Sequence, residues 1–296
     1  MGGKIDYINL DGPFRDMLHP NFPASLGGGL SITTACEELI DYMQTINTAY
    51  PNVQFFILWN TPLWGWKDGV AYTGINQFMG DWYDIMETFL PMVQAAGVPV
   101  RGVTTDNSYD YATKQWPPPW VHTDDPAWQA TDFLARQIDA ENYIKSKGLE
   151  FNVIFNSQHG GQLSAEDFYN ETLAYVKLYR ERGGSPDRVI VQSWDTYPTV
   201  DQIVPETTTY TNTNLAKEVI RYLHCVNPSS ADIDQDCHVE MNDVAIMVSQ
   251  WLKCQPNLSA DIAPSIHDGK VNLSDCSVLV QDWMACGFDV VDMCFQ

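Results

Sequence analysis

The sequence predicts an α/β protein made of a parallel (β/α) barrel-like domain and a small helical module at its C-terminal end. Five short apolar runs alternate with amphipathic stretches of helical period before residue 225. Such alternation is typical of a parallel sheet covered by helices. The composition then changes, because six of the seven cysteines lie from Cys225 onward. We therefore expect a barrel-like domain over residues 1–225 and a separate module over residues 230–296.

The elements of the larger domain follow from the pattern of apolar residues. Strands are expected where apolar runs are continuous, at residues 4–13, 53–59, 98–105, 151–155 and from 187 into the loop of Trp194 and Asp195. Helices are expected where apolar residues recur at helical spacing, at residues 32–49, 77–96, 126–147, 164–183 and 214–223. Ser164 is the expected N-cap of the fourth of these helices, with Asp167 as its capping-box partner.

Two architectures fit five strand–helix units. An open doubly wound sheet needs only five strands, whereas a complete (β/α) barrel needs eight. The loops after the strands are long and rich in tryptophan and carboxylates, and no strand is followed by the short Gly-rich turn of a nucleotide-binding fold. We therefore favour an incomplete barrel, with three units expected ahead of Lys4. The chain starts without a signal peptide, which also favours N-terminal truncation.

Charge and cysteine content limit the classes of partner that the protein can bind and indicate its cellular location. The formal net charge of −22 argues against nucleic acid and anionic membranes, which both need a basic face. No run of about 20 apolar residues is present, so we expect no membrane span. Six cysteines in a small acidic module indicate disulfides and an extracellular or cell-surface location, and no Cys-x-x-Cys pair supports the alternative of a zinc site. We expect Cys36, within a helix, to be the one free thiol.

The carboxyl ends of parallel strands meet at one rim, which is where we expect a site. Three of the five strands end in an aspartate, and glycosidic cleavage needs one carboxyl group as acid and another as nucleophile or base. Asp106 and Asp195 are the leading catalytic pair, and Asp11 is the third candidate. Tryptophan faces can stack on sugar rings, and Asn and His can bind hydroxyl groups. The expected substrate-binding residues are Trp59, Asn60, Trp64, Trp66, Trp116, Trp120, Asn156, His159 and Trp194.

A purely structural interpretation of the same residues is that a strand-end aspartate caps the next helix and that a loop tryptophan anchors its loop. The joint pattern resembles a glycoside-hydrolase-type barrel, which implies an enzyme that hydrolyses the glycosidic bonds of a polysaccharide. In many such barrels the acid and the nucleophile are glutamates, whereas none of the five strands here ends in Glu. Either aspartates serve instead, or part of the machinery lies on further strands. The alternative function is a non-catalytic carbohydrate-binding or scaffold-associated protein.

A metal-type ligand spacing begins at Asp232. Acidic oxygens fall at positions 1, 3, 5, 9 and 12 of a twelve-residue stretch, which is the spacing of a calcium-binding EF-hand loop, and position 7 can supply a backbone carbonyl. An acidic surface loop that binds no metal would not need this spacing of its acidic residues. Position 6 is usually glycine, because the turn favours positive φ, but here it is Cys237. The expected Ca²⁺ ligands are Asp232, Asp234, Asp236, His238, Glu240 and Asp243.

A second copy of this pattern follows, with about three extra residues at 264–266. Each loop leads into an apolar stretch of helical spacing that ends in a Trp, Trp251 in the first copy and Trp283 in the second. The expected ligands of the second loop are Asp261, Asp268, Asn272 and Asp275.

Two tandem loop–helix units without an entering helix resemble a type I dockerin, over about residues 230–286. The resemblance implies bound Ca²⁺ and a cohesin-like scaffold domain as partner. Dockerins usually carry Ser-Thr-like recognition pairs at loop positions 10 and 11. This chain has Met241-Asn242 and Leu273-Ser274 there.

Overall fold

The computed structural model describes residues 4–19, 28–73, 79–119, 121, 123–199, 208–225, 229–234, 237–263 and 268–287. The chain divides into two compact units, Met1–Leu215 and Ala216–Gln296. The division falls within helix α9 (Asn212–His224).

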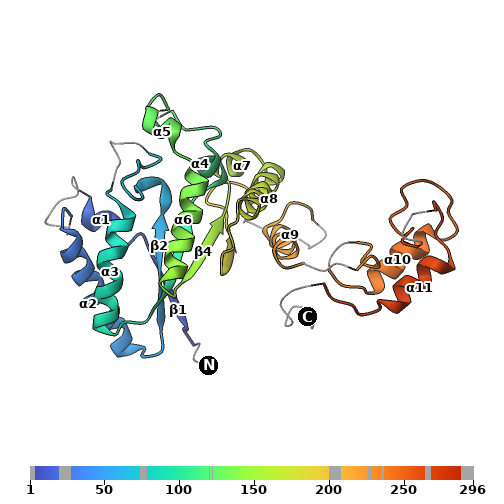
Figure 1. Ribbon diagram of the computed structural model, residues 1–296, viewed down its shortest axis with the longest axis horizontal. Coiled ribbons are helices and arrows are strands. Elements are labelled where there is room, and N and C mark those ends of the chain that lie inside the picture. The colour runs from blue at the N-terminus through green and yellow to red at the C-terminus, as the bar shows by residue number, and fades with distance from the viewer. Residues whose placement is uncertain are drawn as a thin grey trace. The chain divides into compact units, whose positions relative to one another are not determined.

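The larger unit is built on one sheet of five parallel strands, of which Figure 1 labels three. The strands are β1 (Tyr7–Asp11), β2 (Gln54–Asn60), β3 (Val100–Asp106), β4 (Glu150–Phe155) and β5 (Arg188–Val191). They follow one another across the sheet in chain order, and each pairs in parallel with the next. A doubly wound sheet reverses its strand order, so that alternative is wrong. The predicted α/β fold with parallel strands is confirmed, and its sheet is a half-barrel.

Helices occupy the connections between the strands. They are α1 (Arg15–Leu18), α2 (Ile32–Ala49), the 3-10 turn η2 (Thr61–Leu63), α3 (Trp82–Ala96), α4 (Tyr109–Thr113), α5 (Pro126–Ala130), α6 (Phe133–Ser146), α7 (Gln158–Leu163) and α8 (Ala165–Glu181). Helix α2 packs on α3, while α6 and α8 pack on β4. Of the described helices, none is long and apolar enough to cross a bilayer.

Two helix predictions are wrong in their bounds, and local capping explains both. The expected helix 126–147 is two helices, because the side chain of Asp132 accepts the amide proton of Ala135 and starts α6 anew. The expected helix 77–96 begins only at Trp82, because Asp81 caps it through the amide of Tyr83. The predicted cap at Ser164 is confirmed, since its hydroxyl oxygen accepts from the amide of Asp167 at 3.0 Å.

The smaller unit contains two loop–helix repeats around one core. Helices α10 (Met241–Gln250) and α11 (Leu273–Gln281) each begin with a capping box, formed by Glu240 with Asp243 and by Asn272 with Asp275. The strand-like residue His238 bridges to Cys286 beyond α11, and Lys270 bridges to Cys254 beyond α10. The shared core consists of Ala231, Ile233, Val239, Met247, Leu258, Ala260, Val271 and Leu279.

The cysteines only partly follow expectation. Cys225 and Cys237 form a disulfide, and Cys286 is also disulfide-bonded. Cys36 is a buried free thiol in α2 as predicted, and burial raises its pKa to about 12. Among the described residues, however, Cys254 and Cys276 are free as well, so the prediction of one free thiol is wrong. Cys294 lies outside the described residues.

Candidate functional site

Asp106 lies at the carboxyl end of β3, and it is the most perturbed carboxyl group of the rim. Its Oδ1 accepts a hydrogen bond from Nδ2 of Asn156, which directly follows β4, at 3.1 Å. Burial raises the pKa of Asp106 from 3.8 to about 6. The negative charge of Asp11 adds to this rise, while the hydrogen bonds from Asn156 and from the Trp194 side chain oppose it. Near pH 6 the carboxyl group is therefore about half protonated, which suits proton donation.

Tyr111 of α4 lies near enough to both Asp106 and Asp195 to feel their charges. Burial raises the pKa of the Tyr111 phenol, and the negative charges of Asp110, Asp195 and Asp106 raise it further. The two predicted aspartates therefore lie within electrostatic reach of one phenol group. Tyr111 stays protonated at neutral pH, and its hydroxyl donates to Oε1 of Gln158.

Asp195 lies close to helix α7, because the backbone of α7 approaches the loop after β5 closely. Its Oδ1 accepts from Nε2 of Gln162 at 3.3 Å. A Cβ added to Gly161 would lie 3.0 Å from the Cβ of Asp195, and one added to Gly160 would lie 2.8 Å from the backbone of Asp167. Glycine at both positions lets α7 fit between the loop after β5 and the start of α8.

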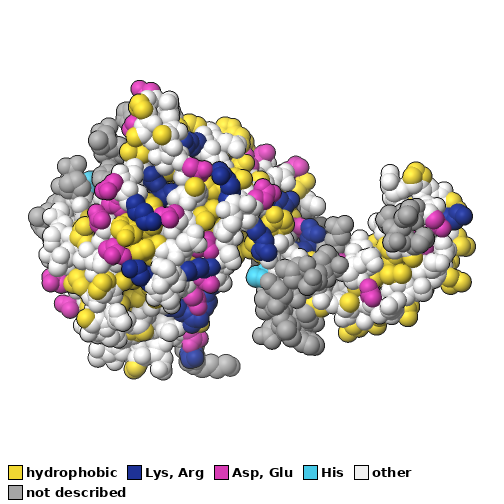
Figure 2. All heavy atoms as spheres, viewed as in Figure 1, with side chains coloured by type: hydrophobic (Ala, Val, Ile, Leu, Met, Phe, Trp, Pro, Cys, Tyr) yellow, Lys and Arg dark blue, Asp and Glu magenta, His cyan; other side chains and the backbone are white. Residues whose placement is uncertain are grey.

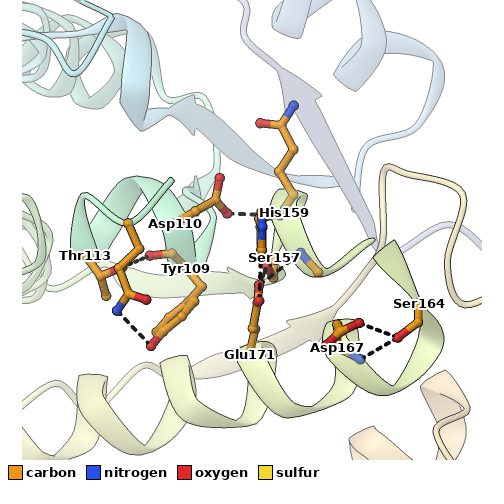
Figure 3. Close-up of polar contacts among 11 residues, drawn as sticks. Tyr109, Asp110, Thr113, Ser157, His159, Ser164, Asp167 and Glu171 are labelled. Carbon is orange, nitrogen blue, oxygen red and sulfur yellow. Dashed lines mark hydrogen bonds and ion pairs between the residues drawn. The ribbon is translucent and has the colours of Figure 1, made fainter. Parts of the chain in front are cut away.

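Two carboxylates fix the N-terminus of α7 and with it His159 (Figure 3). Asp110 accepts the amide proton of Gln158 at 3.0 Å. Glu171 of α8 accepts the amide proton of Gly160 at 2.9 Å, and it also accepts from the hydroxyl of Ser157. Negative charge at a helix N-terminus is favourable, because the free amides there carry partial positive charge. The imidazole Nδ1 of His159 lies 2.9 Å from Oε1 of Glu171, so the carboxylate orients the ring.

The exposed aromatic surface of the rim comes from Trp116 and Trp194. Trp116 is 47% exposed, and its ring stacks on His159 with centroids 4.0 Å apart and an interplanar angle of 2°. Trp194 is 58% exposed, and its side chain hydrogen-bonds Asp106. Trp194 can therefore offer a flat face beside Asp106, and Trp116 lies beside His159.

Three predicted sugar platforms are instead part of the core, so those predictions are wrong. Trp59, Trp64 and Trp66 are 0%, 1% and 5% exposed. Trp59 stacks on Trp82 of α3 with centroids 5.7 Å apart, and Trp66 donates its indole proton to Asp139. Trp59 belongs to β2 itself, whereas Trp64 and Trp66 lie in the loop after it. All three rings are buried, because burial of such large rings stabilises the unit more than exposure would.

The other predicted rim residues occupy separate places. Asn60 is half-buried and pairs in register with Asp106, so it lies beside the site. Asp11 is exposed at the end of β1, where it lines a hollow of about 400 Å³ with Met17, Glu38 and neighbouring residues. Trp120 lies outside the described residues.

Sequence reasoning missed Tyr111, Gln158 and Glu171. The first two lie on α4 and α7, which are too short to show helical periodicity. Glu171 is one of four acidic residues on α8, and nothing in its spacing distinguishes it from the others. The one usable signal was Ser157, which stands two residues before His159 and its two following glycines, because a serine there is expected at a helix start.

The first loop of the smaller unit brings three carboxylates together. Oxygens of Asp232, Asp234 and Asp243 lie within 4.8 Å of one another. Asp232 and Asp243 are buried, while Asp234 is exposed. Asp236, another predicted ligand, lies outside the described residues. Such a set of hard oxygen donors suits a divalent cation such as Ca²⁺.

Asp243 also braces the loop from within. It accepts backbone hydrogen bonds from Ile233, Asp234 and Glu240. A carboxylate has about four lone-pair sites, so one remains for another partner. In the second loop, Asp275 accepts from Ile262, Ala263 and Asn272 in the same way.

Two predicted ligands have a different role in this structure. Glu240 and Asn272 are the N-caps of α10 and α11, and Oδ1 of Asn272 accepts from the amide of Ser274 at 2.8 Å. Helix capping therefore uses their side-chain oxygens. His238 is placed by its backbone bridge to Cys286.

The second loop is more open than the first. Asp261 is 1% exposed, whereas Asp268 is exposed, and both line a hollow of about 540 Å³. Within the described part of the chain, this loop does not gather three carboxylates as closely as the first loop does. The extra residues of its insertion lie outside the described ranges.

Comparison with protein families, with curated proteins and with solved structures found no match to this chain.

Proposed function

We propose that the larger unit hydrolyses glycosidic bonds of a polysaccharide, with Asp106 as the general acid. The observation that carries this proposal is the raised pKa of Asp106, about 6, at a rim that also holds Asp195 and Asp11. Glycoside hydrolysis needs one carboxylic acid that is still protonated near neutral pH and one carboxylate that is ionised. When two carboxyl groups lie in environments that shift their pKa values apart, one can act as the acid and the other as the nucleophile or base.

In this mechanism Asp106 donates its proton to the glycosidic oxygen as the bond to the sugar carbon breaks. Asp195 acts on the other side of the sugar, either as the nucleophile or as the base that takes a proton from water. Asn156 orients Asp106, and Gln162 orients Asp195. The exposed rings of Trp116 and Trp194 bind sugar rings by stacking, and His159 binds a hydroxyl group.

The test is release of reducing ends from a panel of neutral polysaccharides, such as cellulose, xylan, mannan and β-1,3-glucan. The wild-type chain should cleave at least one of them, and Asp106→Asn should lower kcat by at least about 100-fold. Asp41→Asn, on the exposed face of α2, is the matched control and should retain full activity. Binding of a polysaccharide without any cleavage would instead favour the non-catalytic carbohydrate-binding function.

We also propose that the smaller unit is a dockerin-like anchor that binds Ca²⁺ and docks on a cohesin-like scaffold domain. The clustered carboxylates of Asp232, Asp234 and Asp243 support the metal site, and bound Ca²⁺ would supply positive charge that offsets their repulsion. Its oxidised cysteines support an extracellular or cell-surface location.

The exposed apolar residues of the smaller unit support a protein partner. They occupy equivalent places in the two repeats, as pairs Met241 and Leu273, Val248 and Val280, and Leu252 and Met284, each at least 65% exposed. Figure 2 shows hydrophobic side chains gathered over α10 and α11. Within these two helices the only charged residues are Asp243 and Asp275, which are buried. Contiguous exposed apolar surface typically marks an interaction site.

Calcium titration by calorimetry tests the anchor. We expect saturable binding to the full chain and loss of one binding step in Asp232→Asn. Asp41→Asn, on the exposed surface of α2, is the control. A titration that shows no binding to the wild-type chain would refute the metal site.

A further inference from the structure

The first loop holds a cysteine where its repeat holds a glycine. Cys237 and Gly269 occupy equivalent places, because the amide of each donates to the first aspartate of its own loop, Asp232 at 2.9 Å and Asp261 at 2.7 Å. Both have a left-handed backbone, with φ of 74° and 78°. Glycine adopts this conformation without steric cost, whereas a residue with a Cβ is disfavoured there.

A covalent bond holds Cys237 in this conformation. It forms a disulfide with Cys225, which directly follows the last residue of α9, and the two Cα atoms lie 5.9 Å apart. Cys237 is 1% exposed, and its amide hydrogen bond reaches a carboxylate of the proposed metal cluster. Gly269 has no side chain to be tied, so the second loop lacks this restraint at the same position.

We propose that the Cys225–Cys237 disulfide is a redox-sensitive lock on the first calcium loop, an inference that rests on the proposed calcium site. With the bond closed, the tether keeps Cys237 left-handed, so the loop is ordered before metal binds. With the bond open, Cys237 relaxes to negative φ in the metal-free loop, and binding has to restore the disfavoured conformation. Calcium therefore binds the oxidised chain more tightly, by about ten-fold for a strain in the lower half of its usual range.

Opening the lock consumes a dithiol reductant. A thiolate of the reductant attacks the sulfur of Cys225, which is more accessible than Cys237, and the S–S bond breaks to release the Cys237 thiolate. The second thiol of the reductant then displaces Cys225 from the mixed disulfide. The reductant is oxidised to a cyclic disulfide, and the protein gains two thiols. By linkage, bound calcium disfavours this reduction by the same factor by which reduction weakens calcium binding.

Calorimetric calcium titrations of the full chain test the lock. The binding step that Asp232→Asn removes identifies the first loop. For that step, Cys225→Ser should raise Kd about ten-fold, because it leaves a free cysteine at the left-handed position. The double variant Cys225→Ser/Cys237→Gly should return Kd close to the wild-type value, because glycine populates positive φ freely.

Reduction of the wild-type chain with dithiothreitol should reproduce the affinity of Cys225→Ser. The same treatment should leave the double variant unchanged, which controls for the disulfide of Cys286. If Cys225→Ser fails to fold, as judged by circular dichroism, the reduced wild-type chain and the double variant decide. Absence of calcium binding to the oxidised wild-type chain refutes the calcium site and the lock together. Calcium binding that is equally tight after reduction, or a double variant that binds as weakly as the reduced wild-type chain, refutes the lock alone.

Discussion

Replacing Asp106 by Asn should make the larger unit more stable at neutral pH, although it should strongly lower the proposed catalysis. The folded-state pKa of Asp106 is about 6, above the ordinary value of 3.8, so the folded chain holds this proton more tightly than the unfolded chain does. The stability that the protonated group contributes is fully present below about pH 4 and is lost as pH rises through about 6. Asparagine has nearly the same shape as aspartate but does not titrate, so the variant does not lose this stability as pH rises.

The magnitude follows from the size of the shift. A rise from 3.8 to about 6 corresponds to about 3 kcal/mol of unfolding free energy, which is an upper figure because the group keeps some contact with solvent. Urea denaturation at several pH values from about 4 to 8 measures it. The buried rings of Trp59 and Trp82 supply the fluorescence signal of the larger unit.

The difference in unfolding free energy between Asp106→Asn and wild type should grow by about 2–3 kcal/mol between pH 4 and pH 8. Asp41→Asn should show no such growth, because that residue lies on the exposed surface of α2. A difference for Asp106→Asn that stays constant across this range would refute the argument that burial perturbs this carboxyl group.

Three other predictions follow from burial and bonding. Trp116→Ala should raise KM for a polysaccharide and should lower the unfolding free energy by less than about 1 kcal/mol, because this ring is half exposed. Trp59→Ala should lower the unfolding free energy by about 3–5 kcal/mol, because its ring is buried. A reversed order of these two losses in urea denaturation would contradict the assigned burial. Glu171→Ala should cost about 1–3 kcal/mol, because it leaves the buried amide of Gly160 with a weaker acceptor; an unchanged urea midpoint would count against this. Thiol titration of the denatured, non-reduced chain should label Cys36, Cys254 and Cys276, and peptide mapping that finds Cys225 or Cys237 labelled would oppose the disulfide.

The strands could be predicted from sequence because their apolar runs are long and bounded by turns. The run at residues 53–59 is buried on both faces of the sheet, which leaves few alternatives to a central parallel strand. The order of the strands could not be predicted from sequence, because five strand–helix units fit both a doubly wound sheet and a barrel. It is fixed by which strands pair, and pairing depends on contacts between segments far apart in the chain.

The site was predictable at the strand ends and unpredictable between them. Asp106 and Asp195 were expected at one rim because parallel strands place their carboxyl ends there, and both lie close enough to Tyr111 to raise the pKa of its phenol. Tyr111 and Glu171 were missed, because their positions depend on two short helices and on a helix–helix contact. The burial of Trp59, at the end of β2, and of Trp64 and Trp66, in the loop after it, was not predicted, since sequence shows that a segment is aromatic but does not show whether it packs on a helix.

In the two acidic loops of the smaller unit, the ligand spacing indicated the repeat but not the use of every side-chain oxygen. Asp232 and Asp243 come together as the twelve-residue phase predicts. Glu240 and Asn272 also fit that phase, yet each directly precedes a helix whose free amides compete for the side chain. Ligand spacing and helix capping therefore require the same residue types at the same positions.

The pH dependence of kcat/KM on a cleaved polysaccharide tests the central claim most directly. If Asp106 donates the proton, activity should fall about ten-fold per pH unit on the alkaline side of an apparent pKa near 6. Asp41→Asn should show the same profile. A profile that stays flat from about pH 5 to 8, or an unchanged alkaline limb in residual activity of Asp106→Asn, would contradict the assignment of Asp106 as the general acid.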